Sequence, residues 1–251
     1  MINPLERQTQ NRVIKLFTKQ LGYTYYGNWE KREHNSNVES EYLERFLQKQ
    51  GYASNLVKKG VKEVYDLATG NSGNLYDRNK AMYSLLRYGV KARPELGEQF
   101  DTVFPIDWLN WENNEFGIAE EITLNKGQHI RRPDLVLYIN GIAIGVIELK
   151  RGTTDISESV NQSISNQKEL FNQWFYTTVQ LLLAGNNTQG LKYGTIETQA
   201  KYFLSWKEDE QENSDYKLDK YLKKLCNKQR LLDFLYDGVI FDAGVKKLPR
   251  P

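Results

Sequence analysis

The sequence has few of the residues from which disulfides, zinc sites and membrane spans are built. Among its 251 residues there are one cysteine and two histidines. Cys226 cannot form an internal disulfide, and no histidine stands at a spacing typical of zinc binding or nucleophilic catalysis. The most apolar stretch, residues 179–184, is interrupted by Gln180 and is far shorter than the ~20 residues that span a membrane. We therefore expect a soluble, cytoplasmic protein with no membrane partner.

An excess of charge of one sign is also missing. The 34 Lys and Arg residues nearly balance 32 Asp and Glu residues, which leaves a net charge of +2. A value near zero neither favours nor excludes a nucleic-acid partner, because the position of the charges decides. We find no internal repeat and no nucleotide phosphate loop, since residues 70–74 lack the lysine and the serine or threonine that end such a loop.

Helical patterns dominate the first hundred residues. Asn3, Pro4 and Glu6 fit the cap, first position and carboxylate of a helix start, and Gly22 fits its end. A similar capping pattern covers residues 36–39. The predicted helices are residues 3–21, 36–50, 54–68 and 76–90.

From about residue 101 the pattern changes to short, β-branched, apolar segments. Two of them, residues 134–139 and 142–149, are apolar on both faces, which is typical of strands in the middle of a sheet. These features predict an α/β (or α+β) fold in one unit, with a central mixed sheet flanked by helices and a helical N-terminal region. The other predicted elements are strands 116–124, 175–184 and 202–206, and helices 155–171, 216–226 and 230–236.

Three charged residues interrupt the apolar strands. Asp134 begins one strand, and Glu148 and Lys150 end the next. Charged groups in such strands are costly to desolvate unless they are paired or hold a cation. Two carboxylates beside an ammonium suit hydrolysis of a phosphodiester with Mg²⁺, whereas a buried ion pair without catalysis is the structural alternative.

The turn between the two strands decides whether these groups meet. A two-residue turn at Asn140-Gly141 would put Asp134 and Glu148 on opposite faces of the sheet. A three-residue loop, residues 139–141, would put both carboxylates and Lys150 on one face. The catalytic hypothesis therefore predicts the three-residue loop or an equivalent irregularity nearby.

The sequence of this segment resembles that of a known family. Pro133-Asp134 followed by Glu148-Leu149-Lys150 is similar to the PD-(D/E)xK nuclease core. Its context, residues 127–134, 140–142 and 147–150, resembles the N-terminal nuclease domain of the restriction (R) subunit of type I restriction enzymes. The resemblance implies a restriction-endonuclease-like core, the catalytic residues Asp134, Glu148 and Lys150, and Mg²⁺ held by the two carboxylates.

The resemblance also implies secondary site residues. Family members carry a Q-x-x-x-Y element after the core, and here Gln162 matches whereas Asn166 stands at the tyrosine position, so a DNA contact and a solvated helix face both stay open. Glu6 is either an auxiliary metal ligand or a helix-capping residue. For Arg131 and Arg132 two roles stay open and are equally favoured: a contact to phosphate, or a solubilising charge at a strand edge.

The family relationship implies one nuclease domain over residues 1–251. It would comprise a helical part (about 1–100), the nuclease core (about 101–206) and a connection (about 207–251) to an ATP-driven motor that this chain lacks. The expected partners are DNA and the modification and specificity subunits, and ATP would serve only the motor. The alternatives are a non-catalytic assembly or DNA-guiding module and a stand-alone repair or resolvase-type nuclease.

Overall fold

The computed structural model describes residues 4–70, 72–95, 97, 99–207, 216–242 and 244–249. The predicted cap at Asn3 lies outside these ranges. The first helix ends in a π-helical turn, Leu16–Gln20, which Leu21 separates from Gly22. The helices are α1 (Pro4–Lys15), α2 (Ser40–Lys49), α3 (Ser54–Thr69), α4 (Leu75–Tyr88), α5 (Ile156–Asn166), α6 (Lys217–Leu225) and α7 (Lys228–Gly238).

A seven-stranded mixed sheet forms the centre of the fold, in the order β1-β4-β7-β8-β9-β10-β11. Its two parallel pairs are β1 with β4 and β8 with β9, and α5 makes the crossover of the second pair. The other described strands form three two-stranded ribbons. The strands are β1 (Thr24–Asn28), β2 (Val90–Ala92), β3 (Asp101–Val103), β4 (Phe116–Glu120), β5 (Leu124–Lys126), β6 (His129–Arg131), β7 (Leu135–Ile139), β8 (Ile142–Lys150), β9 (Leu181–Asn186), β10 (Gly190–Gly194), β11 (Leu204–Ser205), β12 (Ile240–Asp242) and β13 (Val245–Lys247).

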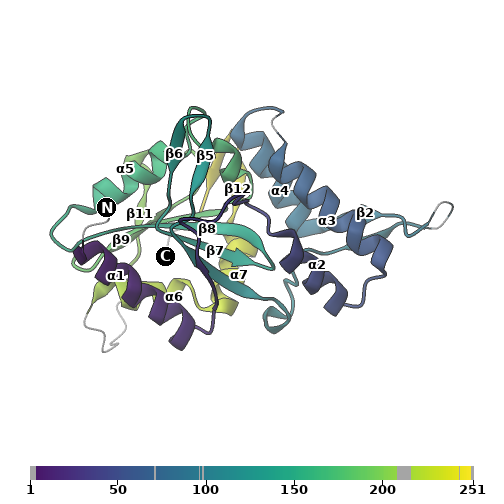
Figure 1. Cartoon of the computed structure of the whole chain (residues 1–251), viewed down its shortest axis with the longest axis horizontal. Helices are drawn as coiled ribbons and strands as arrows, with labels where there is room; N and C mark the ends of the chain where they lie inside the picture. The colour runs from purple at the N-terminus through teal and green to yellow at the C-terminus, as the bar shows by residue number, and fades with distance from the viewer. Residues whose placement is uncertain are drawn as a thin grey trace.

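Helices cover both faces of the sheet. Figure 1 shows α5 on one side and α1 and α6 on the other, with α2, α3 and α4 in a block beyond the turn that joins β7 and β8. None of the helices in the described ranges is long and apolar enough to cross a lipid bilayer. The predicted α/β fold with a mixed central sheet is confirmed, and it is consistent with a restriction-endonuclease-like core.

The central strands contribute to two hydrophobic cores because their side chains alternate between the faces. In β7, Leu135, Leu137 and Ile139 join the core that includes α1, α2, α6 and α7, whereas Val136 and Tyr138 join the core beneath α5. Each of these side chains is at most 1% exposed. The prediction that both faces of this strand are buried is therefore confirmed.

Several predicted boundaries were wrong. The capping pattern at residues 36–39 does not begin a helix, because this segment lies against the β7–β8 turn: Val38 forms a bridge to Ile142, and the Glu39 amide donates to the Gly141 carbonyl at 2.8 Å. Strand β4 stops at Glu120, because the next residue adopts a left-handed conformation. Helix α5 ends at Asn166, not near residue 171, and residues 173–177 form a 3₁₀ helix, not a strand. Strands β1 and β10 of the central sheet and the strands of the three ribbons were not predicted.

Replacing Gly141 by alanine should destabilise the fold more than a similar change elsewhere. Gly141 has φ +81°, and an added Cβ would lie 2.5 Å from the Glu39 carbonyl oxygen. Gly51 has a comparable φ of +86° with no neighbour within 4 Å, so it reports the backbone strain alone. We expect Gly51→Ala to lower the free energy of unfolding by about 1–2 kcal/mol and Gly141→Ala to lower it by at least about 2 kcal/mol more. Urea unfolding followed by circular dichroism measures both, and equal losses would contradict the packing of α2 on this turn.

Candidate active site

The turn between β7 and β8 has two residues, not three. Asn140 and Gly141 have φ values of 51° and 81°, and Ile139 pairs directly with Ile142. The predicted three-residue loop is therefore wrong. Such a turn, continued as a regular ladder, would place Asp134 and Glu148 on opposite faces of the sheet.

A bulge in β8 restores the shared face. Tyr138 pairs with Ala143, but Leu137 pairs with Gly145, so Ile144 is an extra residue without a partner on β7. One extra residue reverses the side on which all later side chains of β8 lie relative to β7. The equivalent irregularity that the catalytic hypothesis predicted is thus present, three residues beyond the turn.

Two segments distant in sequence hold the bulge. The Gln180 amide donates to the carbonyl of Ile144 at 2.8 Å, and the Ala143 amide donates to the carbonyl of Asn37 at 2.9 Å. The bulged residue is itself only 1% exposed. The carbonyl of Ile144 and the amide of Ala143 are therefore both hydrogen-bonded, as buried backbone groups need to be.

Beyond the bulge, the register brings the charged residues together. Leu135 pairs with Ile147, so the next residues along the strands, Asp134 and Glu148, lie opposite each other. Side chains directly opposite in an antiparallel pair have Cβ atoms about 5 Å apart. Lys150, two residues after Glu148, lies on the same face.

Helix α5 supplies a polar residue to two of the three groups. Asp155, the first residue of the helix predicted from the sequence, caps it by accepting a hydrogen bond from the Ser157 amide. On the face toward the sheet, Lys150 Nζ donates to Gln162 Oε1 at 2.7 Å, and Asn166 Nδ2 donates to Glu148 Oε1 at 2.9 Å. Asn166 is 2% exposed, so it does not lie on a solvated helix face.

Burial dominates the electrostatics of the carboxylates. The Asp134 carboxylate accepts a 2.7 Å hydrogen bond from the Leu149 amide, yet burial raises the pKa of Asp134 to about 7. Burial, and next the charge of Asp134, raise the pKa of Glu148 well above its usual range. The Lys150 ammonium opposes both shifts. Asp134 and Glu148 both resist ionisation, and a cation bound between them would stabilise their charged forms.

One oxygen of this pair has no partner. Glu148 is 0% exposed, and its Oε2 accepts no hydrogen bond from any described residue. Hard carboxylate oxygens suit Mg²⁺, which commonly takes one or two protein carboxylates and completes its shell with water and phosphate. The described residues contain no group of three or more His, Cys, Asp or Glu side chains arranged around a metal position. Asp134 and Glu148 therefore fit an open, two-carboxylate Mg²⁺ site.

Helix α1 brings to this site a polar residue, Gln10, that was not predicted. Gln10 is 2% exposed, and its Nε2 donates to the Glu121 carboxylate at 2.8 Å and to the Asp134 carbonyl at 3.2 Å. The Glu121 amide donates to the same carbonyl at 3.0 Å, and Glu121 has a left-handed φ of 53°. Glu6, one helical turn before Gln10, is half-buried, and its charge contributes to the raised pKa of Asp134. The spacing of four residues was the available signal for Gln10.

The two arginines before Asp134 have different environments. Arg132 lies 2.6 Å from the Glu30 carboxylate and 3.9 Å from that of Glu121. Arg131 forms no ion pair with a described residue and lies over the ring of Phe171, 3.5 Å from its centroid. Of the two arginines, Arg131 is therefore the one whose charge no described carboxylate compensates.

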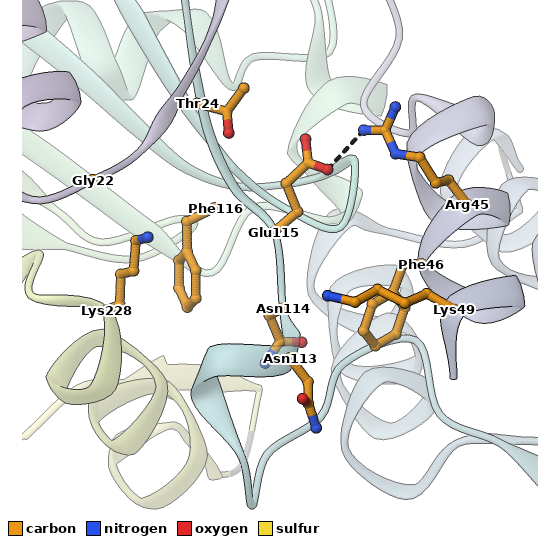
Figure 2. Close-up of a pocket in the computed structure, with 10 residues that line it drawn as sticks. All are labelled: Gly22, Thr24, Arg45, Phe46, Lys49, Asn113, Asn114, Glu115, Phe116 and Lys228. Carbon is orange, nitrogen blue, oxygen red and sulfur yellow. Dashed lines mark hydrogen bonds and ion pairs between the residues drawn. The ribbon is translucent and has the colours of Figure 1, made fainter. Parts of the chain in front are cut away.

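A pocket of about 290 Å³ at the start of β4 is separate from this site. Figure 2 shows Glu115 paired with Arg45 on one side and Lys228 beside Phe116 on the other. Burial lowers the pKa of Lys228. Because Phe116 pairs with Ile139 at the turn end of β7, this pocket lies at the end of the sheet opposite to Asp134.

The fold and the site together define an α/β protein with a restriction-endonuclease-like core. Residues 3–201 match the family described as the type I restriction enzyme R protein N terminus, and the chain belongs to that family.

Proteins named as type I restriction enzyme endonuclease subunits are similar to the chain. The MjaIXP subunit of Methanocaldococcus jannaschii is 27% identical over 264 aligned positions, which cover 89% of the chain and 24% of that protein. The HindI subunit of Haemophilus influenzae is 27% identical over 200 positions, which cover 74% of the chain and 19% of that protein. The chain thus spans about a quarter or less of the length of these relatives.

Without metal, the paired carboxylates should make the fold less stable as pH rises. The folded chain retains protons on Asp134 and Glu148 that the unfolded chain loses from about pH 4 upward, so stability falls through the pKa of Asp134 at about 7. The double variant Asp134→Asn/Glu148→Gln should lack this component and exceed the parent in stability above pH 7. Urea unfolding in EDTA at pH 5, 6, 7 and 8 measures the difference. A difference that stays constant with pH would contradict the assignment.

Proposed function

We propose that the chain is the Mg²⁺-dependent endonuclease domain of the R subunit of a type I restriction-modification enzyme and that it cleaves DNA without sequence preference. Family membership supports the type of subunit. The observation that carries the catalytic part is the bulge at Ile144, which places Asp134 opposite Glu148 and Lys150 beside them.

Each group has a role in hydrolysis of a phosphodiester. A Mg²⁺ ion held by Asp134 and Glu148 would polarise a phosphoryl oxygen and lower the pKa of a bound water. Lys150, oriented by Gln162, places a positive charge where negative charge develops on the phosphorus oxygens. Asn166 holds one oxygen of Glu148, which leaves the other free to bind the ion. Gln10 and Glu121 fix the backbone of Asp134.

Other parts of the enzyme would supply what this chain lacks. Site recognition and methylation are assigned to the specificity and modification subunits, and ATP hydrolysis to a motor in the remainder of the R subunit. Cleavage would follow when translocation of DNA stalls.

Metal binding by the isolated chain provides the first test. Isothermal titration with Mn²⁺ should show a site in the parent chain, and Glu148→Gln should weaken binding at least about 100-fold because it removes one of two anionic ligands. Asn166→Ala should weaken it about 10- to 100-fold by releasing the Glu148 carboxylate. The exposed Glu158→Gln on the same helix is the control and should bind as the parent does.

Cleavage in the assembled enzyme provides the second test. With an R subunit that carries Asp134→Ala or Lys150→Ala, DNA cleavage should fall by at least about 100-fold while ATP hydrolysis stays at the parent rate. Full cleavage by either variant would exclude the proposed catalytic role. If the parent chain binds no metal, or if Asp134→Ala leaves metal binding unchanged, the chain is instead a non-catalytic assembly module.

A further inference from the structure

The ribbon β5–β6 leads directly into Asp134 and carries only positive charge. Residues 124–131 contain Lys126, His129 and Arg131 and no acidic residue. In Figure 1 this ribbon extends from the sheet on the side of α5. Lys126 and His129 are exposed, and Arg131 is half-buried. A positive surface element therefore borders a site that is itself rich in carboxylates.

The pairing of the ribbon gathers these side chains on one face. Lys126 pairs with His129 and Leu124 pairs with Arg131, so all four side chains point to the same side. Leu124 is 1% exposed and anchors this face in the core beneath α5. The three basic residues then lie along one edge of that core.

Two of these residues, His129 and Arg131, pack against the ring of Phe171. The guanidinium carbon of Arg131 lies 3.5 Å from the ring centroid, and the His129 ring meets the Phe171 ring edge-on at 5.5 Å. Lys126 Nζ donates to the backbone carbonyl of Glu169, two residues before Phe171. We name Lys126, His129 and Arg131, together with Phe171, the basic ledge.

The basic ledge is close in sequence to two residues of the candidate active site. Arg131 precedes Asp134 by three residues, which span at most about 10 Å, and Phe171 follows Asn166, the partner of Glu148, by five residues. Phosphates along one DNA strand repeat every ~3.4 Å along the helix axis. A strand whose scissile phosphate lies at the carboxylates would therefore have a neighbouring phosphate within reach of Arg131.

We propose that the basic ledge binds the DNA backbone next to the scissile phosphodiester, with Arg131 as its principal donor; this inference rests on the proposed function. Stacking on Phe171 fixes the plane of the guanidinium. Its Nη1 donates to the Ile130 carbonyl at 3.2 Å, and the N–H groups that this bond does not use remain for phosphate oxygens. No described carboxylate competes for Arg131. Arg132 has no such role, because Glu30 and Glu121 already compensate its charge.

The adjacent arginines provide a matched test. Binding of the 251-residue chain to a fluorescently labelled 20-base-pair duplex is measured by anisotropy in EDTA at several salt concentrations. Arg131→Gln should raise Kd roughly tenfold and reduce the slope of log Kd against log salt by about 1. Arg132→Gln should change Kd less than about twofold and leave the slope unchanged. Phe171→Leu keeps every charge, so it should weaken binding about threefold with an unchanged slope.

Three results would overturn the basic ledge: equal Kd and slope for Arg131→Gln and the parent, equal losses for Arg131→Gln and Arg132→Gln, or no duplex binding by the parent at low salt. Circular dichroism confirms that each variant is folded. The Mn²⁺ titration separates this failure from that of the proposed function. Arg131→Gln should bind Mn²⁺ as the parent does, whereas a metal site that survives Glu148→Gln would refute the catalytic proposal whatever the DNA result.

Discussion

The bulge at Ile144 is the constraint on which the site depends. Without it, the two-residue turn would send Asp134 to one face of the sheet and Glu148 to the other, and each carboxylate would be isolated. The bulge persists because Gln180 and Asn37, which both lie along the edge of β8 that faces away from β7, bind the backbone groups of Ile144 and Ala143. The segment that precedes α2 thus supports the geometry of the candidate site through its backbone.

A second constraint follows from the parallel pairing of β8 and β9. Parallel strands need a crossover, and α5 must begin close to the end of β8 where Lys150 lies. The helix therefore passes over the carboxylates, and residues four apart on it, Gln162 and Asn166, meet Lys150 and Glu148. The same topology that closes the sheet provides hydrogen bonds to groups that would otherwise be buried without partners.

The sequence was sufficient to predict most helices and the central strands but not their register. Strands β7 and β8 could be predicted because they are apolar on both faces, and the start of α5 because Asp155 caps it. The bulge could not be predicted, since it depends on contacts with segments more than 30 residues away in sequence. The capping pattern at residues 36–39 failed for a related reason: pairing of Val38 with Ile142 satisfies the backbone in place of a helix turn.

Strand β1 was missed because its residues, Thr24–Asn28, include a glycine and the exposed Tyr25 in place of an apolar alternation. Its position became clear only through parallel pairing with β4. The buried role of Gln10 was equally hidden, because a glutamine on an N-terminal helix gives no local sign of the carbonyl that it binds. Residues that act through backbone partners carry little signal in their own side-chain type.

The small net charge conceals a separation of charge at the site. Near Asp134 and Glu148, the charges of Glu121 and Glu6 add to the raised pKa of Asp134, and Lys150 opposes it. In the absence of a cation, such a centre lowers the affinity for a polyanion. If the site holds Mg²⁺ as we propose, the ion offsets this effect and the phosphate in turn completes the shell of the ion, so metal and DNA must each strengthen binding of the other. Positive side chains are then needed only at the periphery, where Arg131 lies, and the chain can act on DNA with almost no net charge.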